Sequence, residues 1–384
     1  MGDNMEVRVG VVGLGNIGKF HCSYINEIEG AQLVAVCDKD KKKLNDTSIP
    51  KDFDLKVGNF SEVLNGVSKY TDYKEMIRSG EVDLIIISVP HYFHPDIAIE
   101  AFHHKIHVIC EKPVAVSSRD ALRINEAAQK SNVVFSVMFQ KRVSPVNLKI
   151  HEIIKKGVLG QIIRINWIIT DFFRTQKYYD SGGWRGTWKE EGGGVLINQC
   201  PHYLDLFQWF FGLPKKLSSL VYLGKWHNIL VEDDVSVLME MENGASASFI
   251  TTTGDYPGTN RLEITGSKGK LVYEHGENIT LYLLKKPLPQ IIKNSEEGFY
   301  RVAPSIKKIR IKDIYEGHKY ITQNTINAIL KNEKLISPGI DGIKSVQLAN
   351  SILYSGLMNK QIQFPVSDDL YIKLLETLKE KETI

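Results

Sequence analysis

The chain has 384 residues, of which 43% are hydrophobic and 24% are charged, a composition typical of globular proteins rather than disordered or fibrous ones. Its length predicts two domains. The net charge of +3 is too small to indicate a nucleic-acid partner, and solvated surface explains the basic clusters at 41–43 and 307–312 better. Because no apolar stretch reaches 18 residues and the first residues lack an apolar signal core, we expect no membrane span, no secretion and a cytoplasmic location. The four widely spaced cysteines fit free thiols in a reducing compartment.

Strand and helix patterns alternate over the first third of the chain, which predicts a parallel sheet with helical crossovers. The expected strands are short runs rich in valine and isoleucine, at 7–12, 33–37, 84–89, 107–110 and 133–137. Helical patterns separate them, at 17–27, 73–79, 95–103 and 118–131. Residues 44–72 fit this scheme poorly and indicate an insertion or an irregular crossover. The predicted fold class is α/β, with a doubly wound Rossmann domain over residues 1–141.

The first expected strand leads directly into a G-x-G-x-x-G array formed by Gly13, Gly15 and Gly18. The first glycine permits a tight turn, the second lets the backbone approach a pyrophosphate, and the third lets the helix pack closely on the sheet. The helix N-terminus, with Asn16 and Ile17 in its first turn, would then face the phosphates with its unpaired N–H groups.

An acidic residue completes this pattern, because the second expected strand ends on Asp38, twenty residues after Gly18. A glycine-rich turn in another α/β fold is the alternative, but the strand before the glycines and the acid after them favour a dinucleotide site. A carboxylate at this position can accept both ribose hydroxyls and would repel a 2′-phosphate, so we expect NAD. NADP stays possible because Lys39 and the lysines at 41–43 could partly offset that repulsion.

The second half of the chain has alternating strand patterns, which predict an α+β domain over residues 142–384 with one large open, mainly antiparallel sheet. A helix is expected at 146–156. The expected strands are 162–171, 217–222, 235–241, 245–252, 261–265, 270–273 and 280–284, with further helices near 196–211, 318–331 and 341–358. The outer face of such a sheet needs cover, which predicts a homo-oligomer.

Lys112 is the first candidate for chemistry, because it follows the expected strand 107–110 within Glu111-Lys112-Pro113. Ligands of doubly wound sheets bind outside the carboxyl ends of the strands, and Pro113 favours an extended Lys112. A nearby oxidised nicotinamide is cationic and would lower the lysine pKa, which suits proton transfer near neutrality. The alternative is an ordinary surface lysine in a loop.

A second candidate lies in the segment GGGVLINQCPHYLD at 192–205. On one helix, Asn198, His202 and Asp205 would share a face. Pro201 would kink that helix, or the helix starts at Pro201 and leaves Asn198 on the preceding turn. Histidine suits acid/base catalysis, and Asp205 or Asn198 could fix its tautomer. The alternative is a histidine satisfied within the core.

An aromatic stretch, FFRTQKYYDSGGWRGTW, precedes this segment. Its rings could stack on the C–H face of a sugar while basic side chains serve the hydroxyls, or the rings could pack beneath the loop. The residues concerned are Tyr178, Tyr179, Trp184 and Trp188, with Arg185 and Lys189 as the basic groups.

Together these motifs resemble the Gfo/Idh/MocA oxidoreductases, which include inositol dehydrogenases and glucose–fructose oxidoreductase. The resemblance runs from Val7 to about Pro365 and includes the glycine segment, Ser88-Val-Pro-His-x-x-His94, Glu111-Lys112-Pro113, Trp184-Arg185 and the segment 192–205. It implies reversible hydride transfer between nicotinamide C4 and a carbinol carbon of a sugar or cyclitol, by a dimer or tetramer formed through the second sheet. We expect no metal, and the charge and hydropathy of the chain argue against a nucleic-acid or membrane partner.

The resemblance also implies residue roles. Lys112 would hold the reacting hydroxyl, His202 would be the acid/base, and Asn198 would orient either group. The implied cofactor contacts are Ser88, Val89, His94, Glu111, Lys112, Gln140, Trp184 and Arg185, in addition to Gly13, Gly15, Asn16, Ile17, Gly18 and Asp38. The implied substrate contacts are Lys112, Arg142, Tyr178, Trp184, Arg185, Asn198 and His202, and the resemblance alone suggests that 255–261 and His318 also approach the site.

Two positions depart from the family pattern. Many inositol dehydrogenases have aspartate where Asn198 stands, and asparagine cannot take up a proton, so the resemblance does not carry a full proton relay through this residue. His91 stands where asparagine is frequent. Two other functions stay open: an NAD-dependent glycoside-cleaving enzyme that works by transient oxidation and elimination, and a non-catalytic NAD-binding regulator. Retention of both Lys112 and His202 argues against the regulator.

Overall fold

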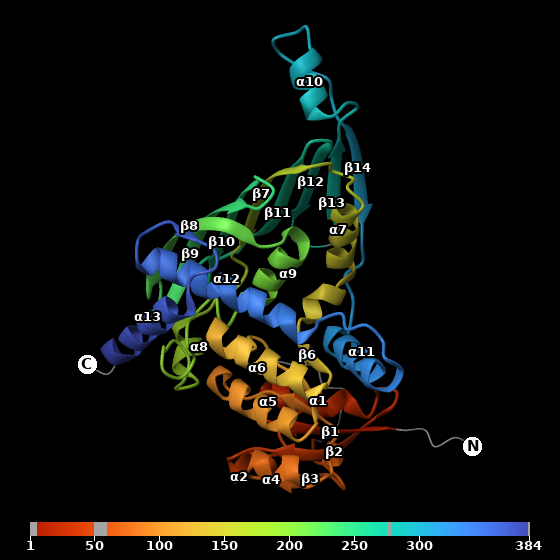
Figure 1. Cartoon of the computed structure of the whole chain (residues 1–384), viewed down its shortest axis with the longest axis vertical. Coiled ribbons are helices and arrows are strands. Elements are labelled where there is room, and N and C mark those ends of the chain that lie inside the picture. Colours follow the sequence, from red (N-terminus) through yellow and green to blue (C-terminus); the bar gives the residue numbers. More distant parts are fainter. Residues whose placement is uncertain (1–5, 50–59, 275, 277, 383–384) are drawn as a thin grey trace. The chain divides into compact units, whose positions relative to one another are not determined.

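A computed structural model describes residues 6–49, 60–274, 276 and 278–382, and its contacts divide the chain into two units (Figure 1). The first unit holds residues 1–142 and 316–346, and the second holds 143–315 and 347–384. The expected second domain had included 316–346. The structure assigns this segment to the first unit because helix α11 (Gly317–Lys331) packs against helix α1 and strand β1.

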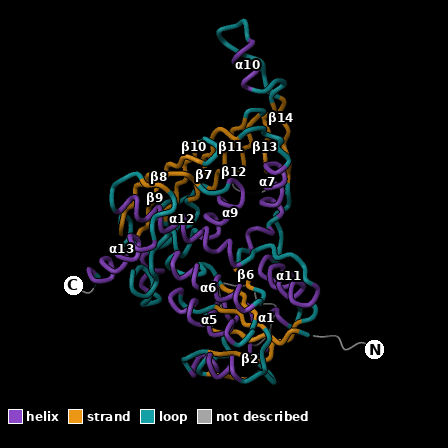
Figure 2. The backbone as a smooth tube through the Cα atoms, viewed as in Figure 1, coloured by secondary structure: helices purple, strands orange, loops and turns teal. Residues whose placement is uncertain are grey.

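The first unit is built on a six-stranded parallel sheet with the order β3-β2-β1-β4-β5-β6. The sequence predicts a parallel sheet here and five of its six strands. Figure 2 shows the strands of this unit in orange and its helices in purple. The strand order reverses between β1 and β4, which is where ligands of such sheets bind. The strands are β1 (Val7–Val12), β2 (Ala31–Cys37), β3 (Ser68–Tyr70), β4 (Leu84–Ile87), β5 (His107–Cys110) and β6 (Phe135–Val137).

Helices connect these strands, and the four expected ones are present. Helix α6 matches its expected range, and the side chain of Ser117 caps it by accepting a hydrogen bond from the backbone N–H of Asp120. The helices of this unit are α1 (Asn16–Ile25), α2 (Lys41–Leu44), α3 (Phe60–Val63), α4 (Tyr73–Arg78), η1 (His91–Phe93), α5 (His94–His103), α6 (Ser118–Ser131), η2 (Gln140–Val143) and α11.

The expectation of an irregular segment at 44–72 is wrong at its end, where β3 pairs with β2 as the edge strand of the sheet. Its three residues, Ser-Lys-Tyr, are only partly buried or exposed, so the strand has no apolar run to signal it. Part of this expectation, 50–59, lies outside the described residues.

The second unit contains a nine-stranded sheet with the order β14-β13-β12-β11-β7-β10-β9-β8-β15, in which only β7 and β10 are parallel neighbours. This confirms the predicted large, mainly antiparallel sheet. The strands are β7 (Ile162–Ile169), β8 (Pro214–Leu223), β9 (Glu232–Met241), β10 (Ser246–Thr252), β11 (Asn260–Gly266), β12 (Gly269–Glu274), β13 (Asn278–Leu283), β14 (Ser305–Arg310) and β15 (Ile362–Gln363).

The two edge strands of this sheet were not predicted. Strand β14 overlaps the basic cluster at 307–312 that was explained as solvated surface, and it pairs with β13 while most of its side chains stay exposed. Charged side chains on an edge strand discourage pairing with other chains, so solvation and strand structure are compatible here. Strand β15 has only two residues.

Helix α9 (Pro201–Phe211) decides between the two geometries proposed for the glycine-rich segment, because it begins at Pro201 and leaves Asn198 on the preceding turn. It packs against α7, where the rings of Trp209 and His151 stack with centroids 3.8 Å apart. The helices of this unit are α7 (Pro145–Lys155), α8 (Gln176–Asp180), α9, α10 (Leu288–Asn294) and α13 (Asp368–Lys381), and α12 (Gly339–Leu357) starts in the first unit and ends in the second.

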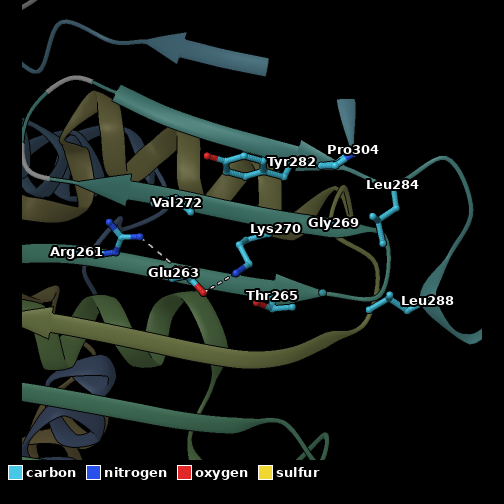
Figure 3. Close-up of a pocket in the computed structure, with 11 residues that line it drawn as sticks. Arg261, Glu263, Thr265, Gly269, Lys270, Val272, Tyr282, Leu284, Leu288 and Pro304 are labelled. Atoms are coloured by element: carbon cyan, nitrogen blue, oxygen red, sulfur yellow. Dashed lines mark hydrogen bonds and ion pairs between the residues drawn. The ribbon is translucent and has the colours of Figure 1, made fainter. Parts of the chain in front are cut away.

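The outer face of the second sheet carries a shallow groove of about 460 Å³ between β11, β12 and β13 (Figure 3). Its charged side chains pair with each other: Lys270 Nζ lies 2.7 Å from Glu263 Oε1, and Arg261 Nη2 lies 3.6 Å from Glu263 Oε2. Arg261 Nη1 also lies 3.1 Å from Glu274 Oε1, so each cation of the groove has a carboxylate partner. No helix in the described part of the chain is long and apolar enough to cross a membrane.

Candidate active site

The glycine turn after β1 has the geometry of a dinucleotide cradle. Gly13 has φ +98°, and a Cβ added there would lie 2.5 Å from the carbonyl oxygen of Ser88. A Cβ on Gly18 would lie 1.8 Å from the carbonyl oxygen of Gly13, so only glycine lets α1 approach the turn. A Cβ on Gly15 would meet nothing within 4 Å, so the space above the helix N-terminus is open to a ligand.

Asp38 lies beside this turn, at the end of β2, with its side chain almost fully buried. Its Oδ2 accepts a hydrogen bond from the backbone N–H of Leu14 at 2.9 Å, and its Oδ1 accepts one from Asp40 N–H at 2.9 Å. Each carboxylate oxygen has a further acceptor site, so the fixed carboxylate can still receive ribose hydroxyls. Lys43 Nζ lies 3.6 Å away and only partly offsets the negative charge. These residues fit NAD.

Ser88 and His94 support the cradle from within the unit. Ser88 Oγ donates to the carbonyl oxygen of Gly13 at 2.9 Å. The ring of His94 is fully buried, with Nε2 2.8 Å from the carbonyl oxygen of Val89 and Nδ1 2.9 Å from that of Pro113. Burial lowers the pKa of His94. Its two ring nitrogens therefore join the segments that follow β4 and β5.

A buried hydrogen-bonded chain begins at Glu111, directly before Lys112. Oε1 of Glu111 lies 2.8 Å from His21 Nε2, His21 Nδ1 lies 2.5 Å from Tyr24 Oη, and Tyr24 Oη lies 3.1 Å from Thr322 Oγ1. The other carboxylate oxygen accepts the backbone N–H of Lys112 at 3.3 Å. Burial pushes the pKa of Glu111 up, but the hydrogen bond and charge of His21, with the nearby His318 and Lys112, outweigh it and bring the pKa to about 2.

His318 of α11 belongs to the same cluster. Its ring centroid lies 5.7 Å from that of His21 and 5.1 Å from that of Phe20. Burial lowers the pKa of His318 to about 4, helped by the positive charges of His21 and Lys112 and opposed by Glu111. The half-buried Lys112 thus lies near the ionised Glu111 and near His318, whose pKa its charge helps to lower.

Arg142, which the family resemblance places near the substrate, lies in a buried ion pair of the first unit. Its side chain is 1% exposed, and Nη1 donates to Asp341 Oδ2 at 2.8 Å and to the carbonyl oxygen of Ile336 at 2.9 Å. The guanidinium therefore holds the start of α12 within the first unit. Gln140 lies in η2, directly after β6 and the short link that follows it.

In the second unit, Asn198 is held by a buried carboxylate that sequence reasoning missed. Its Nδ2 donates to Glu191 Oε1 and lies 3.5 Å from Tyr178 Oη. The other oxygen of Glu191 accepts the backbone N–H of Gly186 at 2.6 Å. One signal in the sequence could have indicated this role. Glu191 directly precedes the glycine run, a position where a small residue would also suit a tight turn, so the presence of a carboxylate there is informative.

A second buried carboxylate, Glu232, holds the glycine run itself. Its two oxygens accept the backbone N–H groups of Gly194 at 2.8 Å and Leu196 at 3.0 Å. Burial raises the pKa of Glu232 to about 7, although both hydrogen bonds favour the ionised form. A Cβ on Gly194 would lie 2.0 Å from the carbonyl oxygen of Glu232, which explains a glycine at this position.

The aromatic stretch divides into two groups. The guanidinium carbon of Arg185 lies 4.7 Å from the ring centre of Tyr178 and 4.5 Å from that of Trp184, so these three side chains form one stack beside Asn198. Trp188 and Tyr179 instead pack beneath the loop, with Trp188 Nε1 donating to the carbonyl oxygen of Leu230 at 2.8 Å.

His202 lies in the first turn of α9 and is 7% exposed. Asp205, one turn later, is buried, and its Oδ1 accepts a hydrogen bond from Gln208 Nε2 at 2.9 Å. Within the second unit, the structure therefore gathers Asn198, Tyr178, Trp184 and Arg185, while Lys112 and its buried partners belong to the first unit. The described residues contain no group of three or more His, Cys, Asp or Glu side chains arranged to hold a metal ion.

Two family models match this chain. Residues 7–139 match the model of an oxidoreductase family with an NAD-binding Rossmann fold, GFO/IDH/MocA, and residues 147–272 match the GFO/IDH/MocA C-terminal domain. The chain is 26% identical over 342 residues to 1-carboxy-3-chloro-3,4-dihydroxycyclohexa-1,5-diene dehydrogenase of Comamonas testosteroni, covering 86% of this chain and 80% of that protein. It is 29% identical over 280 residues to inositol 2-dehydrogenase of Salmonella typhimurium, covering 69% and 73%.

Among solved structures, the chain is similar to the WlbA dehydrogenase of Chromobacterium violaceum in complex with NADH and UDP-GlcNAcA. The TM-score is 0.77 and the identity 25%, with 96% of this chain and 98% of that chain covered.

Proposed function

We propose that this chain, which belongs to the GFO/IDH/MocA family of NAD-binding oxidoreductases, transfers a hydride reversibly between NAD and a carbinol carbon of a sugar or cyclitol. The observation that carries the proposal is the pairing, within one unit, of the dinucleotide cradle with Lys112, whose backbone is anchored by an ionised, buried Glu111. Relatives named for inositol and for a dihydroxylated cyclohexadiene support a ring alcohol as the substrate class.

In this proposal the cofactor residues have separate tasks. Backbone N–H groups at the start of α1 bind the pyrophosphate, and Gly15 leaves the space for it. Asp38 accepts the ribose hydroxyls. Bound NAD supplies the hydride acceptor, and the chain supplies orientation and control of protons.

We assign the proton chemistry to Lys112 and His202. During oxidation the ammonium of Lys112 stabilises the alkoxide that develops on the substrate oxygen, and His202 accepts the hydroxyl proton. Asn198 orients the substrate hydroxyl or His202 through its amide. The stack of Tyr178, Arg185 and Trp184 offers a ring face and a cation to the rest of the polyol.

A screen of inositols, monosaccharides and anhydrosugars with NAD⁺ and NADP⁺ tests the proposal through the absorbance of the reduced cofactor. Reduction with a polyol by the wild type, and its loss in Lys112→Ala, is the expected result. Cleavage of a nitrophenyl glycoside without net NADH would instead favour the glycoside-cleaving reaction. Tight NADH binding without turnover of any compound would favour a regulator.

We also propose a homodimer or homotetramer formed through the outer face of the second sheet. Leu220, Tyr222 and Leu238 project from neighbouring strands β8 and β9 on this face, and Leu238 is 68% exposed. Apolar side chains grouped on an open sheet are typical of an interaction surface.

A further inference from the structure

The side chain of Asn198 is held by the carboxylate of Glu191, which is in turn held by a backbone N–H group. Glu191 is 1% exposed, and its two oxygens have different partners: one accepts the backbone N–H of Gly186 at 2.6 Å, and the other accepts Nδ2 of Asn198. Because Gly186 has φ +70° and an added Cβ would lie 2.8 Å from Ile229, the turn that supplies this N–H is itself closely packed.

We propose that Glu191 is a positioning residue, which locks the amide of Asn198 with Nδ2 toward the carboxylate and thereby commits Oδ1 to the substrate hydroxyl or to His202. A carboxylate accepts hydrogen bonds and cannot donate them, so a flipped amide would place two oxygen acceptors against each other. The amide orientation is therefore set by charge. The role of Asn198 Oδ1 rests on the proposed function, whereas the Glu191–Asn198 pair does not depend on it.

Tyr178 connects the Glu191–Asn198 pair to the stack of Tyr178, Arg185 and Trp184. Its hydroxyl lies 3.5 Å from Asn198 Nδ2 and 3.3 Å from Gln199 Nε2, while its ring lies against the guanidinium of Arg185. Loss of the Glu191 charge would therefore free the amide and also loosen a group that we assign to the substrate.

The surroundings of Glu191 contain other groups that titrate. The charge of Glu191 raises the pKa of Tyr179 and of Glu232, and burial is the larger cause for both. Tyr178 also lies nearby, through Asn198. Because Glu232, with a pKa of about 7, and Tyr179 both respond to the charge of Glu191, their contributions change when that charge changes. The double variant keeps one carboxylate in the pair, as the wild type does, and is therefore the reference for the pH dependence of Asn198→Asp.

A reciprocal exchange tests the pair. Asn198→Asp alone places two carboxylates in contact, so one of them must bind a proton. We expect a lower thermal midpoint than the wild type at about pH 8 and partial recovery at about pH 5.5, where the pair can share a proton. In Glu191→Gln/Asn198→Asp the glutamine amide donates to the new aspartate, and the extra pH dependence should disappear. Glu190→Gln, an exposed neighbour, is the matched control and should match the wild type.

Turnover then tests the positioning role, with the best polyol from the screen and NAD⁺. Glu191→Gln should lower kcat by about 10², the scale for a misplaced catalytic group, while the Kd for NADH stays unchanged. The double variant should recover at least part of the kcat lost in Asn198→Asp. Unchanged kcat in Glu191→Gln would overturn the positioning role.

Additive shifts of the thermal midpoint across the two single variants and the double variant would overturn the pair, whether or not any polyol is oxidised. The thermal midpoints could instead be strongly non-additive while the wild type oxidises no polyol. That result would contradict the proposed function but support the Glu191–Asn198 pair.

Discussion

Glu111 and His21 form a buried pair with 2.8 Å between Oε1 and Nε2, and Lys112 follows Glu111 directly in the chain. His21 is fully buried and continues to Tyr24, so the carboxylate beside the proposed catalytic lysine is anchored in the core of the first unit. Neither residue was predicted to meet the other, since 90 positions separate them.

This pair predicts a defined loss of stability in acid. The pKa of Glu111 is lowered from 4.5 to about 2, so its ionised form contributes stability above pH 4.5, and that contribution is lost as the pH falls toward 2. Glu111→Gln should reduce the free energy of unfolding at neutral pH by about 2 kcal/mol and should lack this part of the acid dependence. Urea denaturation of both proteins across this range measures the difference, with the exposed Glu126→Gln as control. Parallel pH profiles for the wild type and Glu111→Gln would remove Glu111 from the account.

Asp38 predicts a preference for NAD over NADP. Asp38→Ser removes the charge that would accept ribose hydroxyls and repel a 2′-phosphate, so NAD affinity should fall about 10–10²-fold and NADP use should improve. Asp40→Ser, which removes an equal charge while serine can still cap α2, is a matched control. Dinucleotide titrations and kcat/KM for both cofactors measure the change. A wild type that already prefers NADP would show that Asp38 has been wrongly assigned.

Two glycines of the cradle predict opposite outcomes. Gly15→Ala adds a Cβ into open space, so the free protein should keep its thermal midpoint while the dinucleotide loses affinity. Gly18→Ala forces a Cβ to 1.8 Å from the carbonyl oxygen of Gly13, so it should destabilise the first unit itself. Thermal midpoints with and without NADH separate the two effects. Undiminished NADH affinity in Gly15→Ala would place the pyrophosphate elsewhere.

The exposed Leu238 allows the proposed oligomer interface on the second sheet to be tested. Light scattering at micromolar concentration should give two or four times the 43.5 kDa chain mass, and Leu238→Glu should shift the mass toward that of one chain. Leu122→Glu, at an exposed leucine of α6 in the first unit, should leave the mass unchanged. A wild-type monomer would defeat the proposal.

The sequence allows much of the fold and the kind of site to be predicted, for reasons visible in particular residues. Val- and Ile-rich runs mark β1, β2, β4 and β5 because these strands are buried on both faces, and glycine spacing marks the cradle because each glycine meets a separate steric demand. Strands β3 and β14 escaped prediction because edge strands need no apolar run.

Pairing between distant side chains could not be predicted. No sequence motif marks Glu191 or Glu232 as a partner of the glycine segment. Only the folded backbone brings Glu191 to Asn198, and Glu232 to the N–H groups of the glycine run. Arg142 gives a further example, because spacing along the chain gave no sign that its guanidinium binds Asp341. Such contacts depend on tertiary packing, which spacing along the chain does not encode.

The proposal that Lys112 and His202 control the proton of the reacting hydroxyl is tested most directly by single-turnover hydride transfer, measured beside NADH affinity. Lys112→Ala and His202→Ala should each lower the transfer rate by about 10²–10⁴ while the Kd for NADH stays close to that of the wild type. The double variant should be little slower than the worse single variant, because both groups act on one proton. Unchanged hydride transfer in either alanine variant would contradict the account and remove that residue from the mechanism.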